Sequence, residues 1–288
     1  MVASGVPSQP TAPSTELDSL DVKISWTAPN ANYGGITAYE LAIADSTGTA
    51  ITETTYCGSS TAEVFSQLYC LVPMAYLRET YGLARGDLVE ASVRAQGLNG
   101  WGAWSSETSS GVTVETAPSQ MNTPTEGTLT NEAQIEIEWA ALSTAAETGG
   151  STILSYNLQW HDGLDDIDAS WVSLAGDISE YPGTSYIVTL NVERGATYRF
   201  RIRAKNLWGY GDYSSTVALV ASAAPDQVDT AATSIDSSTG DLVISWVAPD
   251  DHGSPITAYR IEVRDKAGSS WTAHSSCDGS SASVVSAV

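Results

Sequence analysis

The sequence predicts an all-β protein made of β-sandwiches in series, two complete and a third cut short, and three observations predict it. An alternating apolar segment that ends in tryptophan occurs three times, at Trp26, Trp139 and Trp246. A stretch at 85–106 aligns without a gap onto 194–215. Apolar residues nowhere recur with a sustained helical period, which argues against helices of consequence.

The first predicted unit is a pair of strands. Each tryptophan ends a short strand of alternating polar and apolar residues, and a Gly-containing loop follows it. A second alternating stretch comes next, at 36–45, 153–162 and 256–265. Alternation with period two marks strands with one buried face, so the same strand, loop and strand recur three times.

The aligned stretches 85–106 and 194–215 predict a long two-faced strand, a tight Gly-rich turn and the start of a last strand. Apolar strands at 112–116 and 216–222 then lead into the pairs Ala117-Pro118 and Ala224-Pro225. Proline fixes its own φ and restricts the residue before it, so we expect short, semi-rigid links and an extended rod. The predicted domains are 1–116, 117–223 and 224–288.

These features resemble fibronectin type III repeats, notably the run Tyr-x-x-x-x-Arg-Ala-x-Asn-x-x-Gly that begins at Tyr198. The resemblance covers nearly the whole chain and implies Ig-like β-sandwiches. It implies that the Tyr198 hydroxyl binds back to the preceding connection, whereas the first domain has Val89 there. The fold serves adhesion, receptor, enzyme-accessory and filament proteins alike, so the resemblance leaves the function open.

Cys57 and Cys277 occupy equivalent places in the first and third repeats, and Cys70 follows Cys57 by 13 residues. A partner for Cys277 would fall at position 290. We therefore predict a Cys57–Cys70 disulfide and an unpaired Cys277; the alternative is three buried thiols in a reducing compartment. The disulfide would offset the missing corner tyrosine by about 3 kcal/mol.

This cysteine-containing repeat also resembles those of large surface proteins of ciliates and related protists, which implies an extracellular or cell-surface setting. The third domain supplies only the first half of a sandwich, with unpaired strand edges. Two explanations are open: the chain continues, or strands from a neighbouring molecule complete the domain. The expected partners are copies of this chain or neighbouring domains of a longer one.

Thirty-four acidic against 12 basic residues give a formal charge of −22, so nucleic acid and anionic membranes are poor partners. No apolar run is long enough to span a membrane, and the opening residues lack the apolar centre of a signal peptide. No Asn-x-Ser/Thr sequon occurs, so N-glycans are not expected, whereas abundant Ser and Thr leave room for O-linked sugars.

Three groups of residues have chemistry worth weighing. The tripeptide Arg85-Gly86-Asp87 is one that integrin-type receptors recognise, but it aligns with a turn entering the penultimate strand, and a turn is favoured. Acidic residues at 162, 165, 166 and 168 are expected to form a solvated hairpin loop, with calcium binding as the alternative. His161, His252 and His274 lack zinc-site spacing, and nucleophile or phosphate motifs are absent, so we predict no enzyme, cofactor or metal.

Aromatic residues crowd the last turns of the first two domains. Two interpretations are open: they form a partner-binding patch, or they cap the sandwich ends and pack against the adjoining domain. These residues are Trp101, Trp104, Trp208, Tyr210 and Tyr213. Our first hypothesis is a structural protein of an extracellular or surface filament or stalk; the rival is an adhesion or binding module that presents the aromatic patch to a protein or carbohydrate.

Overall fold

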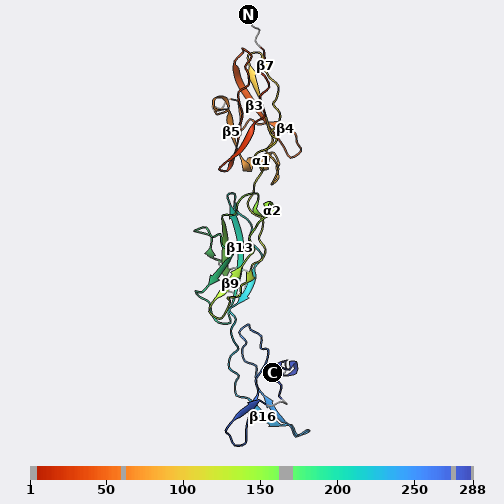
Figure 1. Ribbon diagram of the computed structural model, residues 1–288, viewed down its shortest axis with the longest axis vertical. Helices are drawn as coiled ribbons and strands as arrows, with labels where there is room; N and C mark the ends of the chain where they lie inside the picture. Colours follow the sequence, from red (N-terminus) through yellow and green to blue (C-terminus); the bar gives the residue numbers. More distant parts are fainter. Residues whose placement is uncertain (1–4, 60–62, 162–170, 274–276, 287–288) are drawn as a thin grey trace.

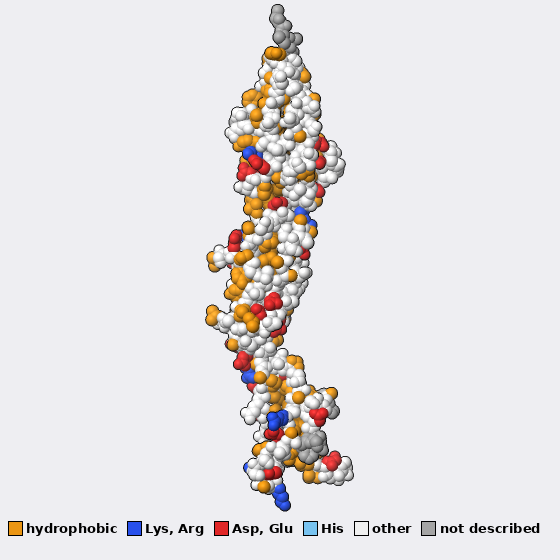
Figure 2. Space-filling model, viewed as in Figure 1, with side chains coloured by type: hydrophobic (Ala, Val, Ile, Leu, Met, Phe, Trp, Pro, Cys, Tyr) orange, Lys and Arg blue, Asp and Glu red, His pale blue; other side chains and the backbone are white. Residues whose placement is uncertain are grey.

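The computed structural model describes residues 5–59, 63–161, 171–273 and 277–286. Three strand-rich segments follow one another along the long axis of the molecule (Figure 1). The strands form antiparallel sheets, as the sequence predicts, and the fold is a series of Ig-like β-sandwiches. Acidic side chains are scattered over all three segments on the face drawn in Figure 2, so the negative charge is spread along the molecule.

The first sandwich packs a three-stranded sheet, in the order β1-β2-β5, against a four-stranded sheet in the order β4-β3-β6-β7. The elements are β1 (Ser14–Asp18), β2 (Asp21–Ser25), β3 (Ile36–Ala44), β4 (Ala50–Thr52), the short π-helix η1 (Glu63–Gln67), β5 (Tyr69–Pro73), α1 (Met74–Thr80), β6 (Ala91–Gly97) and β7 (Gly100–Trp101). Alternate residues of β2 and β5 turn inward, and Ile24, Ile43 and Val93 are fully buried between the sheets.

Helix α1 was not foreseen from the sequence. It starts directly after Pro73 and buries Met74 and Leu77 on the core of the first sandwich. Seven residues make about two turns, which is too short for an apolar period to stand out in the sequence. Tertiary packing of these two side chains stabilises a helix that would be marginal alone.

The second sandwich repeats the arrangement, with sheets in the orders β12-β9-β8 and β11-β10-β13-β14, and β15 paired to β13. The elements are β8 (Thr125–Glu126), β9 (Ile135–Glu138), α2 (Ala145–Thr148), β10 (Ser155–His161), β11 (Val172–Ala175), β12 (Ser185–Val188), β13 (Thr197–Asn206), β14 (Gly209–Tyr210) and β15 (Val217–Val220). Its core centres on Ile137, Leu158 and Phe200, all fully buried, with Trp139 beside them.

The third segment contains two separate hairpins, β16–β17 and β18–β19, and a short helix. The elements are β16 (Ala232–Ile235), β17 (Leu242–Ser245), β18 (Glu262–Arg264), β19 (Trp271–Ala273) and α3 (Ala282–Ser286). The strand expected at 256–265 forms only over β18. Strands β3 and β10 pair along their length with β6 and β13, and the described part of the third segment has no counterpart of β6 or β13.

The two sandwiches differ in which connection is tied to the rest of the domain. In the second, the Tyr198 hydroxyl donates to the Asn191 carbonyl at 2.9 Å and accepts from the Glu193 N–H at 2.8 Å. This is the tie that the resemblance implied. In the first, Val89 is buried at the equivalent place, and a disulfide joins Cys57 to Cys70 of β5 within the core.

A buried carboxylate also fixes the connection between β4 and β5 that the disulfide closes. Glu53, only 2% exposed, accepts hydrogen bonds from the Thr55 and Tyr56 N–H groups through Oε1. The Tyr81 hydroxyl donates to Oε2. Burial, together with this carboxylate, raises the pKa of Tyr81. The segment that leads to Cys57 is therefore fixed by hydrogen bonds as well as by the disulfide.

Candidate functional site

The five aromatic residues of the predicted patch do not lie in one patch. Trp101 and Trp104 hold the guanidinium of Arg94 between them, with ring centres 4.8 and 4.6 Å from its central carbon. Tyr210 and Tyr213 hold Arg203 in the same way in the second sandwich, at 4.0 and 4.3 Å. Each group is a ladder of alternating rings and guanidinium groups on its own sheet.

The backbone explains why the two ladders are equivalent. After the turn, the chain runs back along the long strand, and the Gly102 and Ser105 N–H groups donate to Ala95 and Val93 carbonyls of β6. Gly211 and Ser214 donate to Ala204 and Ile202 of β13 in the same pattern. Trp104, just before Ser105, therefore lies beside Arg94, and Tyr213, just before Ser214, lies beside Arg203.

Each ladder arginine also binds a polar side chain on the neighbouring strand. Arg94 Nε donates to Glu40 Oε2 at 2.6 Å, and its Nη2 makes an ion pair with the same oxygen. Arg203 Nε donates to Asn157 Oδ1 at 3.1 Å. Glu40 pairs with Arg94 across β3 and β6, as Asn157 pairs with Arg203 across β10 and β13.

Trp208 lies at the connection between the first two sandwiches, which we call the first joint. Its ring packs against the core of the first sandwich, and its indole N–H donates to Glu115 Oε2 at 2.7 Å. Asn206 is fully buried and donates from Nδ2 to the Thr116 and Thr148 carbonyls at 2.7 and 2.8 Å. For Trp208, the structure matches packing against the adjoining domain.

The first joint also fixes its backbone closely. The Thr116 N–H donates to the Gly149 carbonyl at 2.8 Å. Gly149 follows α2 with φ of 75°, and a Cβ there would lie 2.1 Å from the Thr116 carbonyl oxygen. Only glycine meets both requirements.

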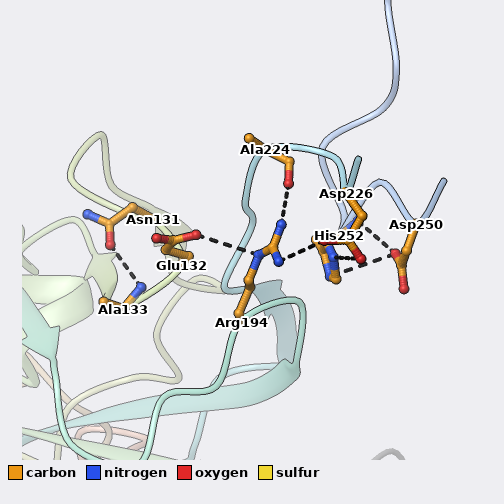
Figure 3. Close-up of polar contacts among 8 residues, drawn as sticks. All are labelled: Asn131, Glu132, Ala133, Arg194, Ala224, Asp226, Asp250 and His252. Atoms are coloured by element: carbon orange, nitrogen blue, oxygen red, sulfur yellow. Dashed lines mark hydrogen bonds and ion pairs between the residues drawn. The ribbon is translucent and has the colours of Figure 1, made fainter. Parts of the chain in front are cut away.

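The connection between the second and third segments, the second joint, is held by charged groups (Figure 3). Arg194 donates to Asp226 Oδ1 at 2.9 Å and to the Ala224 carbonyl at 2.6 Å. His252 Nε2 lies 3.0 Å from Asp226 Oδ2, and its Nδ1 lies 3.8 Å from Asp250 Oδ1. Hydrogen bonds from His252 and then Arg194 lower the pKa of Asp226.

The tripeptide Arg85-Gly86-Asp87 forms a turn before β6. Gly86 has φ of 90° and donates its N–H to the Val114 carbonyl. The Asp87 carboxylate accepts the Ala84 N–H at 2.8 Å, so it is used within its own turn. This geometry fits the favoured interpretation of the tripeptide as a turn.

The candidate calcium loop, with Asp162, Asp165, Asp166 and Asp168, lies outside the described residues, as does His274. His161 contacts the ring of Trp171, and His252 belongs to the second joint. Within the described ranges, no cluster of three or more His, Cys, Asp or Glu side chains could hold a metal ion. Within the same ranges, no helix is long and apolar enough to cross a membrane. Cys277 is half-buried and is not in a disulfide.

Sequence reasoning missed the ladders and the individual contacts that hold the joints. The gapless alignment already set Arg94 over Arg203 and Trp101 over Tyr210, so it could have indicated a repeated arginine and aromatic cluster. The partners of Asn206 and Arg194 had no such indication, because they lie far away in the sequence.

Comparison with known proteins supports fibronectin type III domains in this chain. Human Fibronectin type-III domain-containing protein 3A is 26% identical over 196 residues, which cover 64% of this chain and 15% of the human protein. Mouse Fibronectin type III domain containing protein 3C1 is 28% identical over 123 residues, covering 41% of this chain and 8% of the mouse protein. The chain thus spans only a small part of the curated relatives it matches.

No protein-family model matches the chain. Among solved structures, the FN1–FN3 domains of chicken CNTN1 align with a TM-score of 0.32 at 16% identity, covering 75% of this chain and 68% of that one.

Proposed function

We propose that the chain is a structural component of an extracellular or cell-surface filament or stalk built from fibronectin type III domains in series. The first joint is the observation that carries the proposal. A buried amide bonded to two carbonyls, a packed indole and a glycine with no room for a side chain together fix one sandwich relative to the next. Such a joint favours a stiff rod over a flexible string.

The disulfide supports the proposed location. Disulfides form and persist in oxidising compartments, and Cys57 and Cys70 are bonded within the first core. We also propose that the chain is of the same kind as the cysteine-containing repeats of ciliate and protist surface proteins. Cys277 holds the position of Cys57 in the third repeat. The units of the rod are then 1–116, 117–223 and 224–288, and its partners are copies of the chain or further domains.

Electron microscopy of the native material tests this function. We expect regular filaments with an axial repeat of one or two domain lengths. Dispersed short rods would contradict the proposal and would favour the rival adhesion or binding role.

A second experiment tests the stiffness on which the proposal depends. Small-angle scattering of the 288-residue chain should give the profile of one extended rod. Asn206→Ala should broaden the distribution of distances, because two carbonyls at the first joint lose their donor. Asn99→Ala is the matched control, since Asn99 is exposed on the first sandwich. Equal profiles for both variants would show that the joint does not confer stiffness.

A further inference from the structure

The outer face of the first sandwich has an open hollow of about 590 Å³. Buried Ala42 of β3 and Ser92 of β6 lie at its base. Ala50 and Thr52 of β4 line one side, and Trp104 and Glu107 line the other. The hollow therefore has an aromatic ring, a carboxylate and small side chains around it.

The second sandwich shows what occupies the equivalent space there. Ala42 pairs with Ser92 across β3 and β6, and the corresponding pair across β10 and β13 is Gln159 with Arg201. On the neighbouring strand, Ile43 pairs with Ile51 as Trp160 pairs with Val172. The residues just before are Ala50 and Trp171, so three small side chains in the first sandwich replace three large ones in the second.

Those large side chains extend the second ladder by two steps. The Arg201 guanidinium lies 4.1 Å from the ring centre of Tyr213 and 4.2 Å from that of Trp171. Its Nε and Nη2 donate to Gln159 Oε1 at 3.0 and 2.7 Å. The first ladder stops at Trp104, because Ser92 is too short to reach the position that Arg201 holds beside Tyr213.

We propose that the hollow binds an arginine side chain of a partner protein, with the guanidinium in the place that Arg201 takes in the second sandwich. Trp104 supplies the aromatic face for a cation, and tryptophan is the strongest such partner. Glu107 stands where the second sandwich has Thr216, so the hollow carries a carboxylate that its counterpart lacks.

The charges around the hollow are also compatible with a cationic occupant. Arg94 also lines the hollow, but its charge is paired with Glu40, whereas Arg203 beside Arg201 has only the neutral Asn157. The second sandwich nevertheless accommodates both arginines around Tyr213. The net charge of −22 also draws a basic partner toward the surface. This inference is independent of the mechanical role proposed above.

The test is a titration of the ¹⁵N-labelled 288-residue chain, followed by the indole N–H signals in nuclear magnetic resonance spectra. The probe is the capped peptide Gly-Ser-Arg-Ser-Gly, and Trp104→Phe assigns the Trp104 signal. We expect a saturable shift of that signal with a dissociation constant on the order of 1 mM, as one buried side chain allows. Peptides with citrulline or lysine in place of arginine should bind at least about tenfold more weakly.

Two variants locate the site. Ser92→Arg combined with Ala42→Gln places the side chains of the second sandwich in the hollow, and it should abolish the shift. Glu107→Gln exchanges one exposed carboxylate for an amide of the same size and leaves the buried core unchanged. It should weaken binding severalfold, so it keeps the test decisive if the filled variant fails to fold.

Three results would overturn the proposal. The first is the absence of a saturable shift, and the second is equal binding of the citrulline peptide. The third is unchanged binding by the filled variant. A saturable shift with a neutral disaccharide but not with the arginine peptide would reassign the hollow to carbohydrate.

Discussion

In the second sandwich the Tyr198 hydroxyl ties the long strand to the connection before it, whereas in the first sandwich Val89 stands at that position and a disulfide secures another connection. The outer faces differ too. Gln159, Arg201 and Trp171 fill the second, while Ala42, Ser92 and Ala50 leave the first hollow. The comparison teaches that one backbone pattern can be stabilised by different interactions, and that what varies between repeats is the surface they offer.

The largest expected effect comes from breaking the disulfide. Replacing both Cys57 and Cys70 by serine should lower the stability of the first sandwich by about 3 kcal/mol, because a loop of this length then regains its freedom in the unfolded chain. Differential scanning calorimetry of the whole chain should show one transition move while that of the second sandwich stays. Cys277→Ser is the matched control and should move neither; a double variant as stable as the parent would refute this account.

Removal of the Tyr198 hydroxyl is expected to have the next largest effect. Tyr198→Phe leaves the Asn191 carbonyl and the Glu193 N–H without this partner, which should cost the second sandwich about 1–2 kcal/mol. Urea unfolding measures the loss. Tyr33→Phe is the control, since Tyr33 is 81% exposed and should be neutral. An equal loss in the control would mean that the corner hydrogen bonds are not the cause.

Shortening the second ladder should have a smaller effect. Arg201→Ser reproduces the residue of the first sandwich and removes two aromatic contacts and the bonds to Gln159. We expect a loss of about 1 kcal/mol, because burial lowers the pKa of Arg201 and the cost of that desolvation offsets part of the gain. Urea unfolding checks it, with Arg85→Ser as an exposed control; a gain in stability would reverse our view of the ladder.

The smallest effect concerns the short helices. Helix α2 has a capping box, in which the Glu147 carboxylate accepts the Thr144 and Ser143 N–H groups, whereas α1 starts directly after Pro73 without a side-chain cap. These hydrogen bonds, led by the one from Thr144, lower the pKa of Glu147 from its ordinary value of 4.5. Its contribution is therefore present above pH 4.5 and is lost as the pH falls through the lowered value.

Carboxyl carbon signals in nuclear magnetic resonance spectra measure this directly. Glu147 should titrate below pH 4.5, with the Thr144 amide signal following it, and Glu147→Gln should remove that response. Helix α1, which lacks a side-chain cap, provides the comparison in the first sandwich. A midpoint for Glu147 at or above 4.5 would contradict the role of the capping box.

The architecture could be predicted because its determinants are local and repeated. The strand ending at Trp26 and the alternation around Tyr39 recur in the second sandwich as Trp139 and Tyr156, and each tryptophan ring lies beside its tyrosine. The position of Tyr198 likewise indicated its hydrogen bonds. A sequence pattern that recurs within one chain indicates a backbone structure that recurs with it.

The prolines predicted semi-rigid links, but the contacts that hold the joints, and the hollow, could not be predicted, because they depend on pairs distant in sequence. Asn206 meets Thr116 across 90 residues, and nothing near either one marks the contact. The hollow exists because Ala42, Ala50 and Ser92 are all small, and each alone is unremarkable in a strand. The prediction of a strand over 256–265 was wrong outside β18 for a similar reason. Alternation shows which face a strand would bury but not whether a partner strand is present.

The bond between Cys57 and Cys70 also limits how far the molecule can lengthen under tension. Cys70 follows Cys57 by 13 residues, and their Cα atoms are 5.3 Å apart. At roughly 3.5 Å per extended residue, the closed loop withholds about 40 Å from the length released when the first sandwich is pulled open. The second sandwich withholds nothing of this kind within its described residues, so a stretched chain would yield in two unequal steps, the shorter one marking the domain with the covalent loop.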